Sequence, residues 1–241
     1  VNMSEPAGGS LSLTLSRGIQ LLEYVCAVDA APSIGQVAEH LKVHRSAAYR
    51  LLRTLEAHYL VRRDDAGKIY PAAGLTNLAR GVENSLQTVG LPVMTKIADA
   101  LEMSCFIAVA QGSDCFTLVT VEATTSHAVT QHPGTRHHLD RGAPGVALLA
   151  GLTPQQRDEI ADLELSEKAL ADLAQAEADG YATSHDEVIP GVGSVAVPLM
   201  APGQLPASLA VVYPRREVDE QRIATMLHAG VDTILARLGA A

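Results

Sequence analysis

The chain lacks the features that mark several classes of protein. No uninterrupted apolar run approaches about 18 residues, so we expect no transmembrane helix. The first residues have neither the basic start nor the apolar core of a signal peptide, which indicates the cytoplasm. Three cysteines, Cys26, Cys105 and Cys115, are too few for a disulfide framework, and we expect buried, reduced thiols. Neither a nucleophile-elbow pattern nor a phosphate-binding glycine loop is present, which argues against an enzyme.

The distribution of charge divides the chain into two unlike parts. The chain has 241 residues, 47% of them hydrophobic, which is enough for two domains with well-packed cores. Its net charge is −9, but residues 1–80 carry a net charge of +2 and residues 42–68 alone carry +4. Charges interact over a Debye length of about 8 Å, so the local balance decides whether a surface can bind phosphates. The N-terminal part can therefore bind nucleic acid, and the acidic remainder discourages non-specific binding.

Residues 33–53 have the pattern of a helix-turn-helix. Ser33 is a suitable N-cap for a short first helix, and Lys42 and Val43 leave room only for a tight corner. In the second helix, about 44–57, apolar residues recur at spacings of three and four on one face. The opposite face is polar and basic, with Arg45, Ser46, Tyr49, Arg50 and Arg53. This geometry places a second helix in the major groove of DNA, where we expect these five side chains and Ser33 to make contacts.

The flanking segments complete a winged helix. An amphipathic helix over 16–28 precedes the motif and is expected to bury Ile19, Leu22 and Val25. After the motif, 60–63 and 68–70 form a predicted hairpin around a glycine-containing turn. This wing presents three cations to backbone phosphates, namely Arg62, Arg63 and Lys68. We therefore expect a disordered lead over 1–12 and a DNA-binding domain over 13–73.

A linker helix and an α+β domain are expected in the rest of the chain. The linker occupies 74–88, with a helix over 74–86 that is broken by Gly90 and Pro92 before a second helix over 93–102. The domain over 89–241 is expected to contain one antiparallel sheet. Its predicted strands lie within 104–123, 127–139, 194–200 and 208–213, and its predicted helices over 146–150, 154–161, 166–178 and 219–238. In the first hairpin we expect Cys115 to face Ala110 and Cys105 to face Thr120.

The order and spacing of several pieces resemble the IclR family of bacterial transcription regulators over nearly the whole chain. These pieces are LSRGIQLLEYV (15–25), residues 33–72, the glycines from Gly134 to Gly145, and EADGYATSHDEVIPGVGSVAVPL (177–199). The resemblance implies a winged helix, a linker helix and a GAF-like effector domain of mixed α/β fold. It also implies a homo-oligomer, a dimer or a dimer of dimers, that binds palindromic double-stranded DNA. Family members commonly have Lys-Ser-Thr where this chain has Arg45-Ser46-Ala47, so their base preference does not transfer.

The resemblance also implies a small-molecule pocket in the second domain. It places the lining near 142–145, 184–194 and 210–212, with Gly142, Ala143, Gly145, Val146, Ser184, Asp186, Ser194, Ala210 and Val212 as the named residues. Asp186 and its neighbour Glu187 could equally be surface charges. Three positions that are often more polar in the family are occupied here by Ser184, Ala210 and Val212. The resulting pocket is less polar, which favours an aromatic or apolar effector over a small keto acid. Gly142 and Gly145 could simply permit a turn. Alternatively, they could leave backbone N–H groups free at a helix start, where a carboxylate binds well. We favour the ligand role.

Two other functions are weighed against this one. A metal site is suggested by four histidines, namely His127, His132, His137 and His138. No Cys or acidic residue lies at a recognised ligand spacing from them, and adjacent residues of a strand, such as His137 and His138, point to opposite faces. We therefore expect no metal and no cofactor. Ser194, Cys105 and His185 carry little weight as a catalytic set. The expected function is a ligand-responsive transcription regulator of a catabolic operon, responding to a small organic effector. The alternative is a metabolite sensor whose winged helix binds a protein partner, and a GAF-like hydrolase is third.

Overall fold

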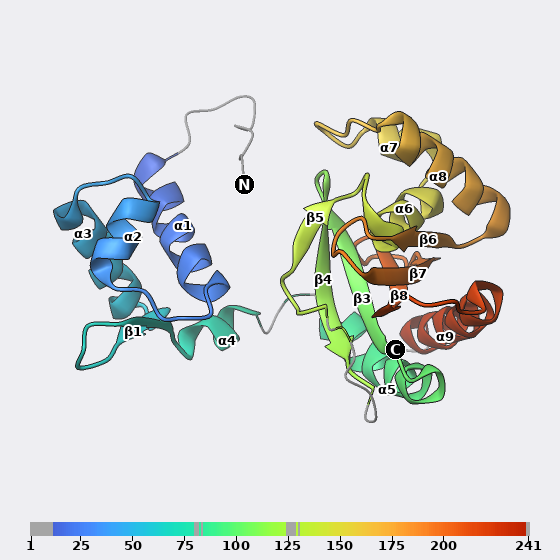
Figure 1. The fold of residues 1–241 in the computed structure, drawn as a ribbon, viewed down its shortest axis with the longest axis horizontal. Helices are drawn as coiled ribbons and strands as arrows, with labels where there is room; N and C mark the ends of the chain where they lie inside the picture. Colours follow the sequence, from blue (N-terminus) through green and yellow to red (C-terminus); the bar gives the residue numbers. More distant parts are fainter. Residues whose placement is uncertain (1–11, 80–81, 83, 124–128, 130, 240–241) are drawn as a thin grey trace. The chain divides into compact units, whose positions relative to one another are not determined.

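The computed structural model describes residues 12–79, 82, 84–123, 129 and 131–239. The chain forms two compact units, Val1–Val82 and Glu83–Ala241 (Figure 1). All but the last residue of the lead expected over 1–12 lies outside the described residues. Among the helices of the described residues, none is long and apolar enough to cross a membrane.

The N-terminal unit has the predicted winged-helix arrangement of three helices and a hairpin. Its elements are α1 (Leu13–Ala27), α2 (Ile34–His40), α3 (Arg45–Ala57), β1 (Val61–Arg63), β2 (Ile69–Pro71) and α4 (Gly74–Ala79). Ser33 caps α2 as expected, in a capping box with Gln36. The core of the unit joins α1, α2, α3 and the hairpin around Leu21, Val37 and Leu52.

The inward face of α1 differs from the predicted one. Leu21 and Val25 are buried, and Leu22 is half-buried, whereas Ile19 is 49% exposed. The apolar residues of α1 cover more than one face, so the periodicity alone did not fix which of them would meet α3. The buried face is the one that includes Leu21.

The prediction of a helix break at Gly90 and Pro92 was wrong. Helix α5 (Asn84–Leu101) runs through both residues and belongs to the C-terminal unit, whereas the predicted linker helix ends as α4 at Ala79. Pro92 costs one backbone hydrogen bond, and glycine about 1 kcal/mol of helix propensity. Burial of the α5 face that includes Met94 and Ile97 offsets these costs. A Cβ at Gly90 would lie 2.6 Å from Ile107 Cδ1, so a larger residue there would require the Ile107 side chain to move.

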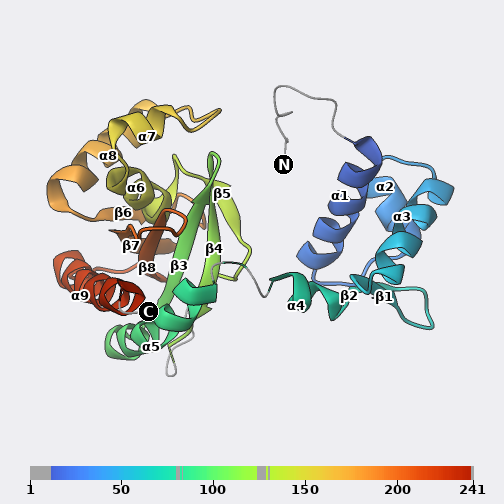
Figure 2. The same ribbon diagram turned by 180° about the vertical axis from the view of Figure 1, so that it is seen from behind.

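The C-terminal unit is a six-stranded antiparallel sheet with helices on both faces. Its further elements are β3 (Ser104–Gln111), β4 (Asp114–Val121), β5 (Arg136–His138), α6 (Gly142–Gly151), α7 (Pro154–Asp158), α8 (Glu167–Asp179), β6 (Ala182–His185), β7 (Val192–Leu199), β8 (Ala207–Pro214) and α9 (Glu220–Gly239). The strand order is β5-β4-β3-β8-β7-β6. Helices α5 and α9 cover one face of the sheet, and α6 and α8 cover the other (Figures 1 and 2). The mixed α/β class with one antiparallel sheet is confirmed.

The register of the first hairpin is shifted by a bulge. Cys115 faces Ala110 as expected, but a register shift between Ile107 and Ala108 pairs Cys105 with Val121 in place of Thr120. All three thiols are free, and burial raises the pKa of the Cys115 thiol to about 12. Cys26 is exposed, which contradicts the expected burial of all three.

Candidate DNA interface and effector pocket

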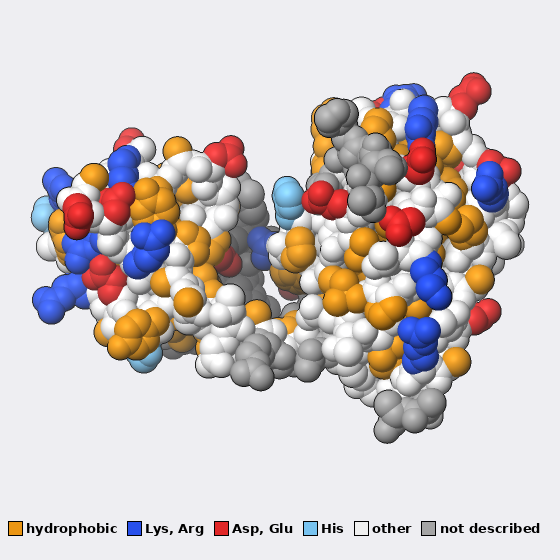
Figure 3. Space-filling model, turned by 90° about the horizontal axis from the view of Figure 1, so that it is seen from below, with side chains coloured by type: hydrophobic (Ala, Val, Ile, Leu, Met, Phe, Trp, Pro, Cys, Tyr) orange, Lys and Arg blue, Asp and Glu red, His pale blue; other side chains and the backbone are white. Residues whose placement is uncertain are grey.

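The outer face of α3 carries the residues expected to read DNA. Arg45, Ser46, Tyr49, Arg50 and Arg53 are all exposed, whereas Ala48 and Leu52 on the opposite side are buried. The turn before α3 is held by His44, whose ring Nδ1 accepts from the Ser46 N–H at 3.3 Å and lies 2.9 Å from the Ser46 Oγ. Figure 3 shows Lys and Arg side chains (blue) gathered on part of the N-terminal unit, with acidic side chains among them.

The wing cations differ in what holds them. The Arg62 guanidinium lies 4.5 Å from the centre of the Tyr70 ring, a cation–π contact across the hairpin. The Arg63 guanidinium points back to α3 and pairs with Glu56. Lys68 is half-buried and lies next to Asp64, where hydrogen bonds from the Lys68 N–H and the Tyr70 hydroxyl lower the pKa of the carboxyl group. The hydroxyl of Ser33 is used in capping α2.

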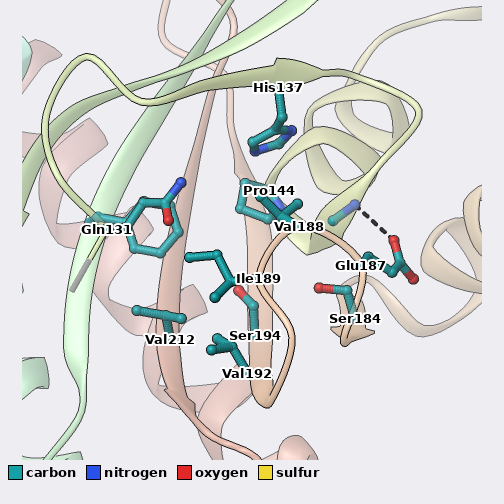
Figure 4. Close-up of a pocket in the computed structure, with 12 residues that line it drawn as sticks. Gln131, His137, Pro144, Ser184, Glu187, Val188, Ile189, Val192, Ser194 and Val212 are labelled. Atoms are coloured by element: carbon teal, nitrogen blue, oxygen red, sulfur yellow. Dashed lines mark hydrogen bonds between the residues drawn. The ribbon is translucent and has the colours of Figure 1, made fainter. Parts of the chain in front are cut away.

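A pocket lies on the α6 side of the sheet, at the start of that helix (Figure 4). The two edge strands both reach it, β5 through His137 and β6 through Ser184, so the sheet curls until its edges approach the same place. Four predicted lining residues are present, namely Gly142, Ser184, Ser194 and Val212. Five more lining residues lie within the predicted stretches 142–145 and 184–194, namely Pro144, Glu187, Val188, Ile189 and Val192. The lining also includes three residues that the sequence did not indicate, namely Phe106, Gln131 and His137.

The first N–H groups of α6 are in use, which contradicts the expected free anion site. The Gly142 N–H donates to Glu187 Oε2 at 2.8 Å, and the Ala143 N–H donates to Ser184 Oγ at 2.9 Å. The same Glu187 carboxylate accepts from Lys168 Nζ at 2.6 Å. Gly142 has φ +75°, and a Cβ there would lie 2.9 Å from Val188 Cγ2. The glycine therefore allows the 187–189 segment to close over the helix start.

Five predicted pocket residues lie outside its lining. Asp186 accepts from the Gly191 N–H at 2.6 Å and pairs with Arg215. Gly145 is close to the backbone, since a Cβ would lie 2.6 Å from the Leu139 carbonyl oxygen, so its role is packing. The other three are buried in the core between α6 and the sheet, namely Ala143, Val146 and Ala210.

Comparison with known proteins identifies the architecture. A model of the IclR helix-turn-helix domain matches residues 14–65, and a model of the bacterial transcriptional regulator IclR C-terminal domain matches residues 82–234. This chain belongs to the IclR family. It is therefore a ligand-responsive transcription regulator and not an enzyme.

The relatives of this IclR-family chain match it over most of their length. The regulator BhcR of Paracoccus denitrificans is 24% identical over 95% of this chain and 86% of that protein. The repressor AllR of Escherichia coli is 23% identical over 92% of this chain and 88% of that protein. The crystal structure of an IclR homologue complexed with 4-hydroxybenzoate, from Microbacterium hydrocarbonoxydans, has a TM-score of 0.80 at 22% identity, covering 95% of this chain and all of the other. A structure from Alicyclobacillus acidocaldarius has a TM-score of 0.78 at 17% identity, covering 94% and 99%.

The histidines of this IclR-family chain do not form a metal site among the described residues. His137 and His138 are neighbours in β5, and His127 lies outside the described residues. His137 Nδ1 donates to the His138 carbonyl oxygen at 3.0 Å, which leaves Nε2 of the neutral ring as an acceptor. Burial lowers the pKa of His137. In Figure 4 this ring points toward the pocket, which a pattern of adjacent histidines did not indicate.

Proposed function

We propose that the chain binds palindromic operator DNA as a homo-oligomer and that a small organic effector changes this binding. The exposed basic face of α3 carries the proposal, because a winged helix uses this face to read the major groove. Two copies would present their α3 helices to half-sites about 34–36 Å apart, or a multiple of that distance. The protein would act in the cytoplasm, with residues 13–73 as the DNA-binding domain and control of a catabolic operon as its role.

We propose that the effector is an aromatic or apolar carboxylic acid. The pocket wall is mostly apolar, with Phe106, Ile189 and Val212 among its residues, and it also holds His137 and Gln131. A homologue of similar fold has been crystallised with 4-hydroxybenzoate. An aromatic ring suits the apolar wall, while the neutral His137 ring offers an acceptor for a hydroxyl group.

Binding of such an effector requires the 187–189 segment to move. The cavity volume is about 30 Å³, whereas a cavity of about 150 Å³ accommodates benzene. Glu187, Val188 and Ile189 line this cavity and begin two residues after the end of edge strand β6. An effector carboxylate would take the place of the Glu187 carboxylate as acceptor of the Gly142 N–H, at the start of α6, where the helix dipole favours an anion.

A gel-shift titration tests the DNA-binding part of this proposal. The full chain would be titrated against the intergenic DNA upstream of its gene and against a random duplex of equal length, at several salt concentrations. We expect tighter binding to the intergenic duplex, and an affinity for it that falls as salt increases. Equal affinity for both duplexes would favour the alternative, a sensor whose winged helix binds a protein partner.

Calorimetry with a panel of aromatic and aliphatic carboxylic acids tests the effector part. We expect saturable binding of at least one aromatic acid, with 4-hydroxybenzoate as the first probe. The same acid should then change the midpoint of the gel-shift titration, because binding at one site is coupled to affinity at the other. An acid that binds without changing the affinity for DNA would contradict a regulatory role for the pocket.

A further inference from the structure

The two neighbouring arginines of the wing are turned to different partners. Arg62 and Arg63 are consecutive in β1, so their side chains leave opposite faces of the hairpin. Arg62 stacks on Tyr70 of the paired strand β2. Arg63 faces α3, where it contacts Glu56 and Tyr49. Neither of these residues is on the side of α3 that packs into the core. A basic pair on a wing therefore need not act as two equal phosphate contacts.

The contact of Arg63 with Glu56 is a bidentate ion pair. Arg63 Nε donates to Glu56 Oε1 at 2.6 Å, and Nη2 donates to Oε2 at 3.0 Å. Both side chains are partly shielded from water, with 35% of Arg63 and 24% of Glu56 exposed. This fork-to-fork geometry fixes the plane of the guanidinium, which a single hydrogen bond does not. The wing is thereby joined to the recognition helix at one defined orientation.

The fixed guanidinium also meets the side chain expected to read bases. Its central carbon lies 5.8 Å from the centre of the Tyr49 ring, within the range of a cation–π contact. Tyr49 is 38% exposed and lies on the outer face of α3, between Arg45 and Arg53 along the helix. Glu56, Arg63 and Tyr49 thus form a chain of contacts from the helix to the wing and back to the helix.

We propose that Arg63 is a positioning residue that sets the orientation of the Tyr49 ring for DNA recognition, and not a phosphate contact. This inference rests on the assignment of α3 to the DNA interface. It revises the expectation that all three wing cations meet phosphates: Arg62 keeps that role, and the Arg63 charge is neutralised by Glu56. It also makes Glu56, an acidic residue on a basic helix, part of the recognition surface.

The two roles predict different effects of a lysine substitution. A phosphate contact needs positive charge, which lysine also carries, so Arg63→Lys should keep the salt dependence and most of the affinity. A bidentate, planar contact needs the guanidinium, so lysine should fail nearly as badly as a neutral residue. A lost phosphate contact also reduces the slope of log affinity against log salt by about 1, whereas a lost positioning contact leaves that slope unchanged.

The experiment measures binding of full-length variants to a duplex that the wild-type chain selects from a random pool, and to a random duplex of equal length. For Arg63→Lys we expect the ratio of specific to non-specific affinity to fall about fivefold with no change in salt slope. Arg222→Lys, at an exposed arginine of α9, is the matched control and should bind as the wild type does, while Arg62→Met, which removes a phosphate contact, should lose about 1 from the slope. In a Tyr49→Ala background, Arg63→Lys should cause no further loss of the ratio.

Three results would overturn the proposal. Arg63→Lys could retain the ratio while Arg63→Met loses about 1 from the slope, which would make Arg63 a phosphate contact. Both Arg63 variants could instead behave as wild type. If Arg63→Lys fails to fold, Glu56→Gln replaces it: we expect a lower ratio, and an unchanged or higher ratio would contradict positioning. A wild-type chain that selects no sequence would contradict the proposed function itself.

Discussion

The Glu187 carboxylate accepts a hydrogen bond from the Gly142 N–H at 2.8 Å, across 45 residues of sequence. Ser184 takes the next N–H of the same helix start, and Lys168 neutralises the carboxylate from α8. The structure thus fills with its own side chains the place where the sequence predicted a free anion site. A carboxylic acid that binds at this place has to compete with Glu187.

Removing the charge of Glu187 should strengthen the binding of a carboxylic acid. Glu187→Gln keeps the size of the side chain but removes its repulsion of an incoming carboxylate. We expect the affinity for 4-hydroxybenzoate, measured by calorimetry, to rise about tenfold, which corresponds to roughly 1.4 kcal/mol. Asp186→Asn is the control, because the Asp186 carboxylate is held by Gly191 and Arg215 and should not affect affinity. Weaker binding by Glu187→Gln would mean that the carboxylate contacts the ligand directly.

Two buried residues of β8 should respond differently to replacement by serine. Val212 lines the pocket, so Val212→Ser should weaken binding of 4-hydroxybenzoate about fivefold through lost apolar contact. Ala210 is fully buried but outside the lining, so Ala210→Ser should leave affinity unchanged and lower the melting temperature. Calorimetry and thermal unfolding measure the two effects. An equal loss of affinity in both variants would place the ligand elsewhere along β8.

Removing Arg45 should weaken specific DNA binding without unfolding the N-terminal unit. The side chain is exposed at the start of α3, and a bidentate contact from arginine to guanine contributes roughly 1–3 kcal/mol. For Arg45→Ala we expect about a tenfold loss of affinity in a gel-shift titration and an unchanged melting temperature. Lys96→Ala removes an exposed cation from α5 and should bind DNA as the wild type does. Unchanged affinity of Arg45→Ala would refute the base contact.

His137 should make the stability of the protein depend on pH. Burial lowers the pKa of its imidazole below the ordinary value of 6.5. Between the two values the unfolded chain binds more protons, so the free energy of unfolding falls as pH decreases through this window. Wild type should therefore lose more thermal stability than His137→Asn between about pH 7.5 and about pH 5.5. His132→Asn changes an exposed histidine and should behave as wild type; an equal loss in all three proteins would show that His137 contributes nothing.

The N-terminal unit was predicted well because its signals are local. Ser33 caps α2 through a residue three positions away, and the wing closes within ten residues. Arg63 marks the limit of that approach. The sequence shows a cation on a wing, but only the packed unit shows that Glu56, seven residues earlier, takes its charge.

The errors in the C-terminal unit arise from tertiary packing. Propensity favours a break at Pro92, yet burial of α5 against the sheet outweighs that preference. The bulge between Ile107 and Ala108 changes the pairing partner of Cys105 from Thr120 to Val121, and no residue type in the hairpin indicates this bulge. Strand β6 was missed because its four residues, Ala182–His185, are too short to show a clear alternation.

The lining of the pocket was predicted only in part, again because part of it depends on tertiary packing. Residues near the start of α6 and on β7 and β8 followed from the family resemblance. His137 could not be found in this way, because it comes from edge strand β5 and is brought close to the rest of the lining only by the curl of the sheet. The sequence left open whether Asp186 and Glu187 are pocket groups, and only Glu187 lines the pocket, because adjacent residues of a short segment can point in different directions.

The curl of the sheet gives a bound effector a mechanical role. Strands β5 and β6 are the two edge strands of the six-stranded sheet, so each pairs with a single neighbouring strand. They are also short, with three and four residues. Short edge strands are among the first parts of a sheet to open. A molecule seated between His137 and Ser184 would act as a non-covalent cross-link between two edges that share no backbone pairing. Its binding would slow amide exchange at both ends of the sheet together.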